Sequence, residues 1–377
     1  MFDGKSHKTV PMICAIMAAA LFGATAPVAK LFLDGIGPVM LAALFYLGGG
    51  TGLLLYILLS GMTGRRRQSI EAAITRKDLP VLIGIMLFGG VFAPVTLMFS
   101  LQYVDAATAV LLLTFEPVAT TIFAAMLFKE WVSRQVWAAM GLIAIACGVL
   151  TYDPSATLSF SLAAIGVLLC AVFWATDNNL SRILSGRDPI VMVSFKGLGA
   201  GVISFSLALL IGERLPSPKI VAISMFVGFL AYGGVTSVLF FYALRGIGAA
   251  RAGSLLALSP FFGVAIAFLI FREPPTILFL IAFPVMIAGT ALLLTERHSH
   301  RHIHPELVHE HRHHHDDGHH DHEHGPEDPP VSRKGDHSHL HVHEKMTHSH
   351  PHMPDIHHQH EHLRKNRYSY SLLKRFR

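Results

Sequence analysis

The sequence predicts an all-α membrane protein with ten transmembrane helices in two inverted five-helix repeats, followed by a disordered tail. Three observations predict this fold class. Of the 377 residues, 52% are hydrophobic and only 15% are charged. The apolar residues fall into runs of about 20 residues, the length that crosses a bilayer. A long stretch of the chain also occurs twice at a fixed spacing. This composition is that of a polytopic membrane protein and excludes a soluble enzyme.

Ten apolar runs follow one another along the chain. They lie at about 10–33, 37–60, 79–101, 106–128, 134–152, 158–181, 189–211, 220–244, 250–271 and 276–295. The connections between them are short and many carry Gly, Pro or Asp, as is typical of antiparallel neighbours. All three cysteines fall inside apolar runs, which predicts buried thiols and no disulfide framework.

The internal repeat explains how the ten runs are organised. The stretch Leu101–Glu130 recurs without a gap as Leu244–Glu273, 143 positions later. A shift of 151 positions likewise brings Phe22–Pro38 onto Phe173–Pro189. The chain is therefore two copies of a five-helix unit, and because five is odd, the second copy is inverted in the membrane. Inverted repeats are the architecture of alternating-access transporters, whose substrate site lies near the midplane at the repeat interface.

The charges between the runs predict the orientation and the domain limits. Most basic residues lie in loops that are cytoplasmic if the N-terminus is cytoplasmic, among them Lys5, Lys8, Arg65, Arg66, Arg67, Arg76, Lys77, Lys129, Arg134, Arg182, Arg187, Arg245 and Arg251. This bias predicts a multi-pass protein of the inner (plasma) membrane with both termini in the cytoplasm. The expected domains are the first repeat (1–152), the second repeat (153–295), a His-rich tail (296–363) and a basic amphipathic C-terminus (364–377).

The end of the fourth run, EPVATTIFAAMLFKE, and its echo in the ninth, SPFFGVAIAFLIFRE, carry a family resemblance. Together with the short helices and the duplication, they resemble the EamA branch of the drug/metabolite transporter superfamily over about residues 10–295. The resemblance implies a secondary carrier, commonly an exporter of amino acids, metabolites or toxic compounds. Many relatives carry a basic residue early in the second helix, where this chain has Phe45-Tyr46. The corresponding place in the second repeat is Lys196, so any role of that charge falls to the second half.

The first candidate site residue is Glu116, a carboxyl group in the middle of the fourth run. The repeat copy has Ser259 at this position, so the carboxyl group is particular to the first half. An ionisable group at membrane depth is costly and is a functional candidate by default. We expect Glu116 to couple transport to a proton or to bind substrate. The alternative is a carboxyl group that stays protonated, or one that bonds to backbone freed by Pro117.

A second polar group comes from the sixth and seventh runs. Trp174 precedes the sequence Asp177-Asn178-Asn179, and Lys196 lies early in the seventh run. Asp177 and Lys196 are similarly distant from the turn between these runs, so both lie roughly 14 Å deep at ~1.5 Å per residue. A buried Asp177–Lys196 ion pair is therefore expected. It either locks two helices together or lines the transport cavity with Trp174, Asn178 and Asn179.

The tail after Glu296 predicts metal binding. All of the 25 histidines except His7 lie between His298 and His362, many of them at alternate positions. In an extended chain, alternate residues face one side about 7 Å apart, so two imidazoles can share an ion. Neutral imidazole suits Zn, Ni, Co or Cu. The candidate ligands are His298, His300, His302, His304, His313, His314, His315, His337, His339, His341 and His343. The alternative is a pH-responsive polar tail.

The predicted function is a secondary transporter of small molecules, an exporter driven by a cation gradient, with the proton as the expected coupling cation. No Walker A, HExxH or GxSxG motif occurs, which disfavours ATP-driven pumping and enzymatic chemistry. No cofactor is required, and nucleic acid is not an expected partner. Two alternatives remain open: a Zn, Ni or Co exporter whose tail gathers the ion, and a membrane-anchored metal buffer or sensor.

Overall fold

The computed structural model describes residues 6–62, 74–128, 132–152, 158–184, 187–295, 299–304, 307–314, 336–343 and 346–351. In this part of the chain ten helical segments are long and apolar enough to cross a membrane, which confirms the predicted spans. They are Thr9–Phe32, Pro38–Met62, Arg76–Leu101, Ala106–Phe128, Arg134–Thr151, Ser161–Ile183, Pro189–Leu210, Pro218–Leu244, Arg251–Phe271 and Ile277–Leu294.

Several spans consist of two or more helical elements. The helices are α1 (Ser6–Gly23), α2 (Thr25–Phe32), α3 (Pro38–Met62), α4 (Leu79–Ile85), α5 (Ala93–Leu101), α6 (Ala106–Leu113), α7 (Phe115–Phe128), α8 (Arg134–Thr151), α9 (Leu158–Ile183), α10 (Pro189–Leu210), α11 (Pro218–Ala231), α12 (Val235–Ile247), α13 (Ala249–Leu256), α14 (Ser259–Phe271) and α15 (Ile277–Leu294). A short 3₁₀ helix, η1 (Arg76–Asp78), precedes α4, and a π-helical segment, η2 (Met86–Phe92), joins α4 to α5.

Local sequence signals set where several helices begin. The hydroxyl of Ser133 accepts a hydrogen bond from the Val136 amide at the start of α8. The carboxylate of Asp188 accepts from the first amides of α10, and the hydroxyl of Thr276 accepts from the Phe279 amide at the start of α15. These side chains satisfy N–H groups that have no partner within the helix, which stabilises each helix start.

The duplicated stretch contains the same break in both copies. The backbone leaves α6 at Thr114 with φ −64° and ψ −7°, and it leaves α13 at Ala257 with the same two angles. These two positions are 143 residues apart, so the shift that aligns the sequences also aligns the breaks. Each break precedes a proline, which has no backbone N–H to donate into the preceding turn. The fourth and ninth spans are therefore discontinuous helices related by the repeat.

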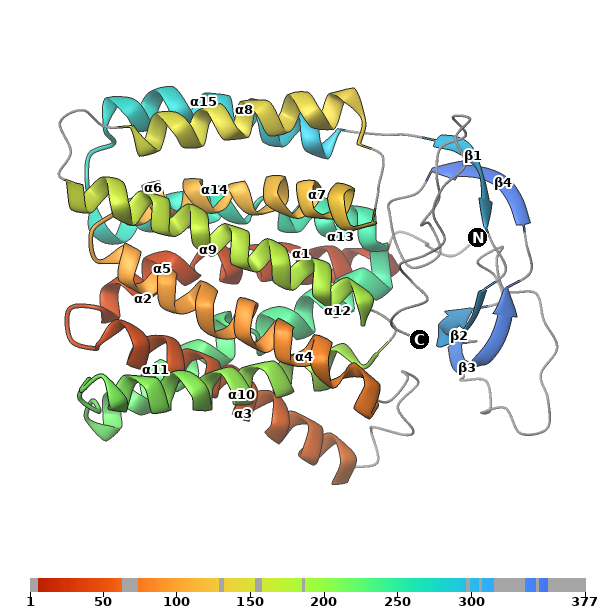
Figure 1. Cartoon of the computed structure of the whole chain (residues 1–377), viewed down its shortest axis with the longest axis horizontal. Coiled ribbons are helices and arrows are strands. Elements are labelled where there is room, and N and C mark those ends of the chain that lie inside the picture. Colours follow the sequence, from red (N-terminus) through yellow and green to blue (C-terminus); the bar gives the residue numbers. More distant parts are fainter. Residues whose placement is uncertain are drawn as a thin grey trace.

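Equivalent helices of the two repeats pack against each other, as Figure 1 shows for α3 beside α10 and for α8 beside α15. Glycines permit the close approach of α3 to its neighbours. A Cβ added to Gly50 would lie only 2.7 Å from the carbonyl carbon of Gly197. One added to Gly49 would lie only 2.8 Å from the backbone carbonyl oxygen of Tyr232, so neither position has room for a side chain without a shift. The Gly48-Gly49-Gly50 segment therefore allows close packing of α3 against α10 and α11.

The described part of the tail contains four strands: β1 (Ser299–His304), β2 (Leu307–His314), β3 (Asp336–His343) and β4 (Met346–Pro351). They form two antiparallel pairs, β1 with β4 and β2 with β3 (Figure 1). The physical reason is the alternating sequence, since a period of two residues is that of an extended strand. His298, His315 and the predicted basic C-terminus (364–377) lie outside the described residues.

Candidate transport site

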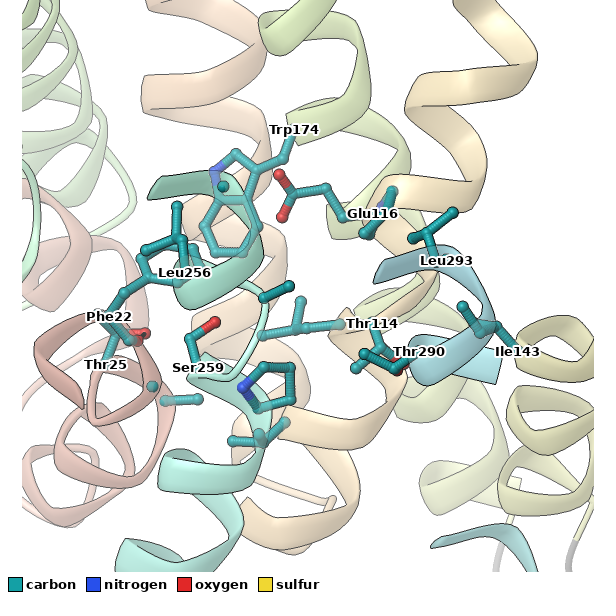
Figure 2. A pocket seen from close by; sticks show the side chains of 18 residues that line it. Phe22, Thr25, Thr114, Glu116, Ile143, Trp174, Leu256, Ser259, Thr290 and Leu293 are labelled. Atoms are coloured by element: carbon teal, nitrogen blue, oxygen red, sulfur yellow. Dashed lines mark hydrogen bonds between the residues drawn. The ribbon is translucent and has the colours of Figure 1, made fainter. Parts of the chain in front are cut away.

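A cavity of about 240 Å³ lies where the discontinuous spans meet. Its wall includes both repeat-related breaks, at Thr114 and Ala257, and the break between α1 and α2 beside Gly23. The remaining wall is mostly apolar. Figure 2 shows the side chains that line it: Phe22, Thr25, Ala26, Val110, Leu113, Glu116, Pro117, Ile143, Trp174, Gly253, Leu256, Ser259, Pro260, Thr290 and Leu293. Non-helical backbone within membrane spans is tolerated where it lines such a cavity.

Glu116 projects into this cavity from the first turn of α7. The Nδ2 of Asn178 donates a hydrogen bond of 2.7 Å to its Oε1. The start of a helix stabilises a carboxylate, because the free amides and the helix dipole carry positive partial charge there. Ser259, the repeat counterpart of Glu116, occupies the first position of α14 and lines the same cavity. The two repeats thus present a carboxyl group and a hydroxyl group at equivalent places.

Trp174 lines the cavity next to Glu116 (Figure 2), and its indole ring is hydrogen-bonded to the π-helical segment. Its indole Nε1 donates to the carbonyl oxygen of Gly89 at 3.3 Å, and the hydroxyl of Tyr46 donates to the same oxygen at 2.7 Å. The amide of Ala93 bonds to the Phe88 carbonyl, the wider spacing of a π-helix. Such segments occur mostly at functional sites. Sequence reasoning missed Tyr46 and Gly89; the Gly89-Gly90 pair was the available signal.

Asp177 and Lys196 form the predicted ion pair. The Nζ of Lys196 contacts Oδ2 of Asp177, and the two side chains are 19% and 9% exposed respectively. The hydroxyl of Ser181 donates a longer hydrogen bond of 3.4 Å to the other carboxylate oxygen. A Cβ on Gly89 would lie 2.6 Å from the Lys196 Nζ, so the glycine leaves room for the pair. The pair joins α9 to α10 next to the π-helical segment.

The structure divides the predicted site residues into two groups. Glu116 and Trp174 line the cavity, whereas Asp177, Asn178, Asn179 and Lys196 are not among the described residues of its wall. Asn178 reaches the cavity through its hydrogen bond to Glu116. The amide of Asn179 instead donates to two backbone carbonyl oxygens, those of Thr120 and Ala175, and so connects α9 to α7.

Contacts within the first repeat and between the two repeats join helices towards one end of the bundle. The Nζ of Lys30, near the end of α2, donates a hydrogen bond of 2.6 Å to the Val104 carbonyl oxygen. The same group lies 5.8 Å from the ring centre of Phe271 at the end of α14. The first and ninth spans also cross closely, since a Cβ on Gly263 would lie 2.6 Å from the Gly23 oxygen. This end is opposite to that at which α1 begins.

At the other end, a bidentate ion pair joins the two repeats. Arg187, in the connection between α9 and α10, contacts both carboxylate oxygens of Asp78 at 3.1 Å and 3.3 Å. Asp78 ends the 3₁₀ helix η1 and also accepts hydrogen bonds from the amide and the hydroxyl of Thr75. Bidentate geometry makes this one of the stronger types of ion pair.

Comparison with known proteins agrees with this architecture. The EamA-like transporter family matches residues 9–152 and 161–295. An uncharacterized transporter of Methanothermobacter thermautotrophicus is 29% identical over 297 residues, which cover 74% of this chain and 85% of the relative. The uncharacterized transporter YdfC of Bacillus subtilis is 26% identical over 294 residues, covering 75% and 90%. One solved crystal structure has a TM-score of 0.54 at 18% identity, covers 76% of this chain and 96% of its own, and shows the fold alone.

Proposed function

Because the chain belongs to the EamA-like transporter family, we propose that it is a secondary active exporter of small organic molecules, such as metabolites, amino acids or toxic compounds. One observation supports this most strongly. The breaks of two repeat-related helices meet at a cavity that also holds the carboxyl group of Glu116. Discontinuous helices that meet near the middle of the membrane are where secondary transporters bind substrate and coupling ion.

In the proposed mechanism, Glu116 exchanges a proton and the cavity is exposed to each side of the membrane in turn. The carboxyl group is close enough to the substrate space for a proton and a substrate to compete for it. In this mechanism the contacts of Lys30 break when the cavity opens to their side, and the Asp78–Arg187 pair breaks when it opens to the other side. We propose that both termini are cytoplasmic, which places the contacts of Lys30 at the outer end.

A sensitivity screen tests this function. A strain that lacks the gene is exposed to amino acids, antimetabolites and metal salts, and is complemented with wild-type protein or with Glu116→Gln. We expect sensitivity to at least one organic compound, restored to normal by the wild type alone. Sensitivity confined to salts of Zn, Ni or Co would contradict the proposal and favour the metal-exporter alternative.

We also propose that the tail binds divalent transition metals. The strand register supports this, because it sets histidine against histidine: His309, His311 and His313 of β2 lie opposite His341, His339 and His337 of β3. In β1 and β4, His300 and His302 lie opposite His350 and His348. Directly opposite residues share a face of the sheet and are roughly 5 Å apart, a spacing at which two imidazoles can ligate one ion.

Truncation after Thr295 is expected to abolish metal binding by the tail and to leave export of organic substrate unchanged, because the tail lies outside the two repeats. Isothermal titration of the purified full-length and truncated proteins with Ni²⁺ measures the first effect. Binding should weaken sharply below about pH 6, because protonated imidazole cannot ligate and its unperturbed pKa is ~6.5.

A matched pair of triple variants tests the strand register. Replacement of His309, His311 and His313 by alanine should weaken Ni²⁺ binding more than replacement of His357, His358 and His360, which lie outside the described residues. Equal losses would show that only the number of histidines matters. Loss of Zn, Ni or Co efflux on truncation, with no organic substrate found, would contradict the organic-exporter proposal.

A further inference from the structure

We propose that the molecule transported through this cavity is a small organic cation, an amine with an aromatic or aliphatic body, bound between the carboxylate of Glu116 and the ring of Trp174. The inference rests on the proposed transport function and adds the class of substrate.

The charge of the cavity wall is the first argument. Among the described residues that line the cavity, Glu116 carries the only ionisable side chain. The nearest basic group of the site, Lys196, is already paired with Asp177, so that pair adds no net charge. An anion would meet a carboxylate in apolar surroundings, where repulsion between like charges is strong. An ionised Glu116 therefore selects a cation, and a proton competes with it for the same group.

The asymmetry of the repeats is the second argument. The shift of 143 sets Glu116 against Ser259, and the shift of 151 sets Trp174 against Gly23. All four residues line the cavity. The first repeat thus contributes a carboxyl group where the second has a hydroxyl group, and the second contributes an indole ring where the first has a glycine. Figure 2 shows them side by side on one wall, so the asymmetry creates one combined binding position.

The hydrogen bonding of Trp174 is the third argument. Its N–H is occupied by the Gly89 carbonyl, and so it is not available to bind an anionic or carbonyl-bearing substrate. The same bond fixes the orientation of the ring. The centre of the Phe22 ring lies 6.3 Å from that of the Trp174 ring, and the two ring planes are tilted by 49°. Aromatic rings attract cations, most strongly in the case of tryptophan, and the attraction grows when water is excluded.

The volume of the cavity limits the size of the substrate. Pockets for drug-sized molecules measure roughly 300–1,000 Å³. The cavity of about 240 Å³ lies below this range. A single-ring amine or an aliphatic amine of similar size is therefore favoured over a large multi-ring cation.

Binding to the purified full-length protein tests the inference with three probes of similar shape: 3-phenylpropylamine, which is a cation at neutral pH, 3-phenylpropionamide and 3-phenylpropionate. Isothermal titration at neutral pH should show the cation bound at least about tenfold more tightly than the neutral and anionic probes. Glu116→Gln should remove that preference, whereas Glu273→Gln, a carboxyl group outside the cavity wall, should keep it. Trp174→Leu should weaken cation binding, and Trp174→Phe should restore part of it.

Equal or tighter binding of the neutral or anionic probe would overturn the inference. Uptake of the same probes into proteoliposomes separates this failure from that of the proposed function. Protein-dependent uptake of the amide or the carboxylate alone would leave transport standing and refute the cationic substrate. Cation binding without protein-dependent uptake of any probe would support the binding site and count against the transport function.

Discussion

Replacement of Glu116 by glutamine is expected to reduce substrate transport to background while the protein remains inserted and folded. Glutamine has nearly the same size and keeps an oxygen that can accept the hydrogen bond from Asn178, but it cannot ionise. If Glu116 couples substrate movement to protons, the coupling is lost with the charge. Flux driven by a pH gradient in proteoliposomes measures the effect, with Glu273→Gln as the matched control. Wild-type flux by a well-folded Glu116→Gln protein would exclude Glu116 as the coupling group.

Removal of one partner of the Asp177–Lys196 pair is expected to destabilise the protein by roughly 3–5 kcal/mol, because the other charge is left buried without compensation. The two side chains are only 9% and 19% exposed. The double variant Asp177→Asn, Lys196→Met should therefore lose less stability than the sum of the two single variants. Unfolding of the four proteins in the same detergent measures this coupling.

The Asp78–Arg187 pair provides the comparison, because its side chains are similarly buried, at 10% and 24% exposed, but it lies near the end of the spans. The corresponding variants Asp78→Asn and Arg187→Met should show a smaller coupling, since access of water weakens an ion pair. Additive losses for Asp177 and Lys196 would contradict direct contact between their side chains.

The sequence was sufficient to predict the ten spans, the duplication and the Asp177–Lys196 pair. Span length follows from bilayer thickness, and the pair follows from equal depth in adjacent antiparallel helices. The family resemblance to EamA transporters was also correct. Each of these depends on local composition or on the order of helices along the chain.

Features that depend on packing between distant segments were not predicted. Pro117 and Pro260 lie within the fourth and ninth spans, but the breaks lie three residues earlier, at Thr114 and Ala257. The π-helical segment and the shared acceptor at Gly89 arise from contacts with α3 and α9, which no local pattern encodes. In the tail, alternating histidines suit an extended strand, but no local pattern shows that β2 pairs with β3.

Accessibility of the cavity from the two sides of the membrane tests the alternating-access account most directly. The three native cysteines are replaced, and Ser259→Cys introduces a single cysteine in the cavity. A second protein carries Ser217→Cys instead, in the exposed connection between α10 and α11, and shows which side of the membrane the reagent reaches. Membrane-impermeant maleimide is applied to either side. We predict labelling of position 259 from the side of the α1 start without substrate, and from the opposite side when substrate and a reversed proton gradient are supplied. Labelling from one side under all conditions, or from both sides at once, would contradict the account.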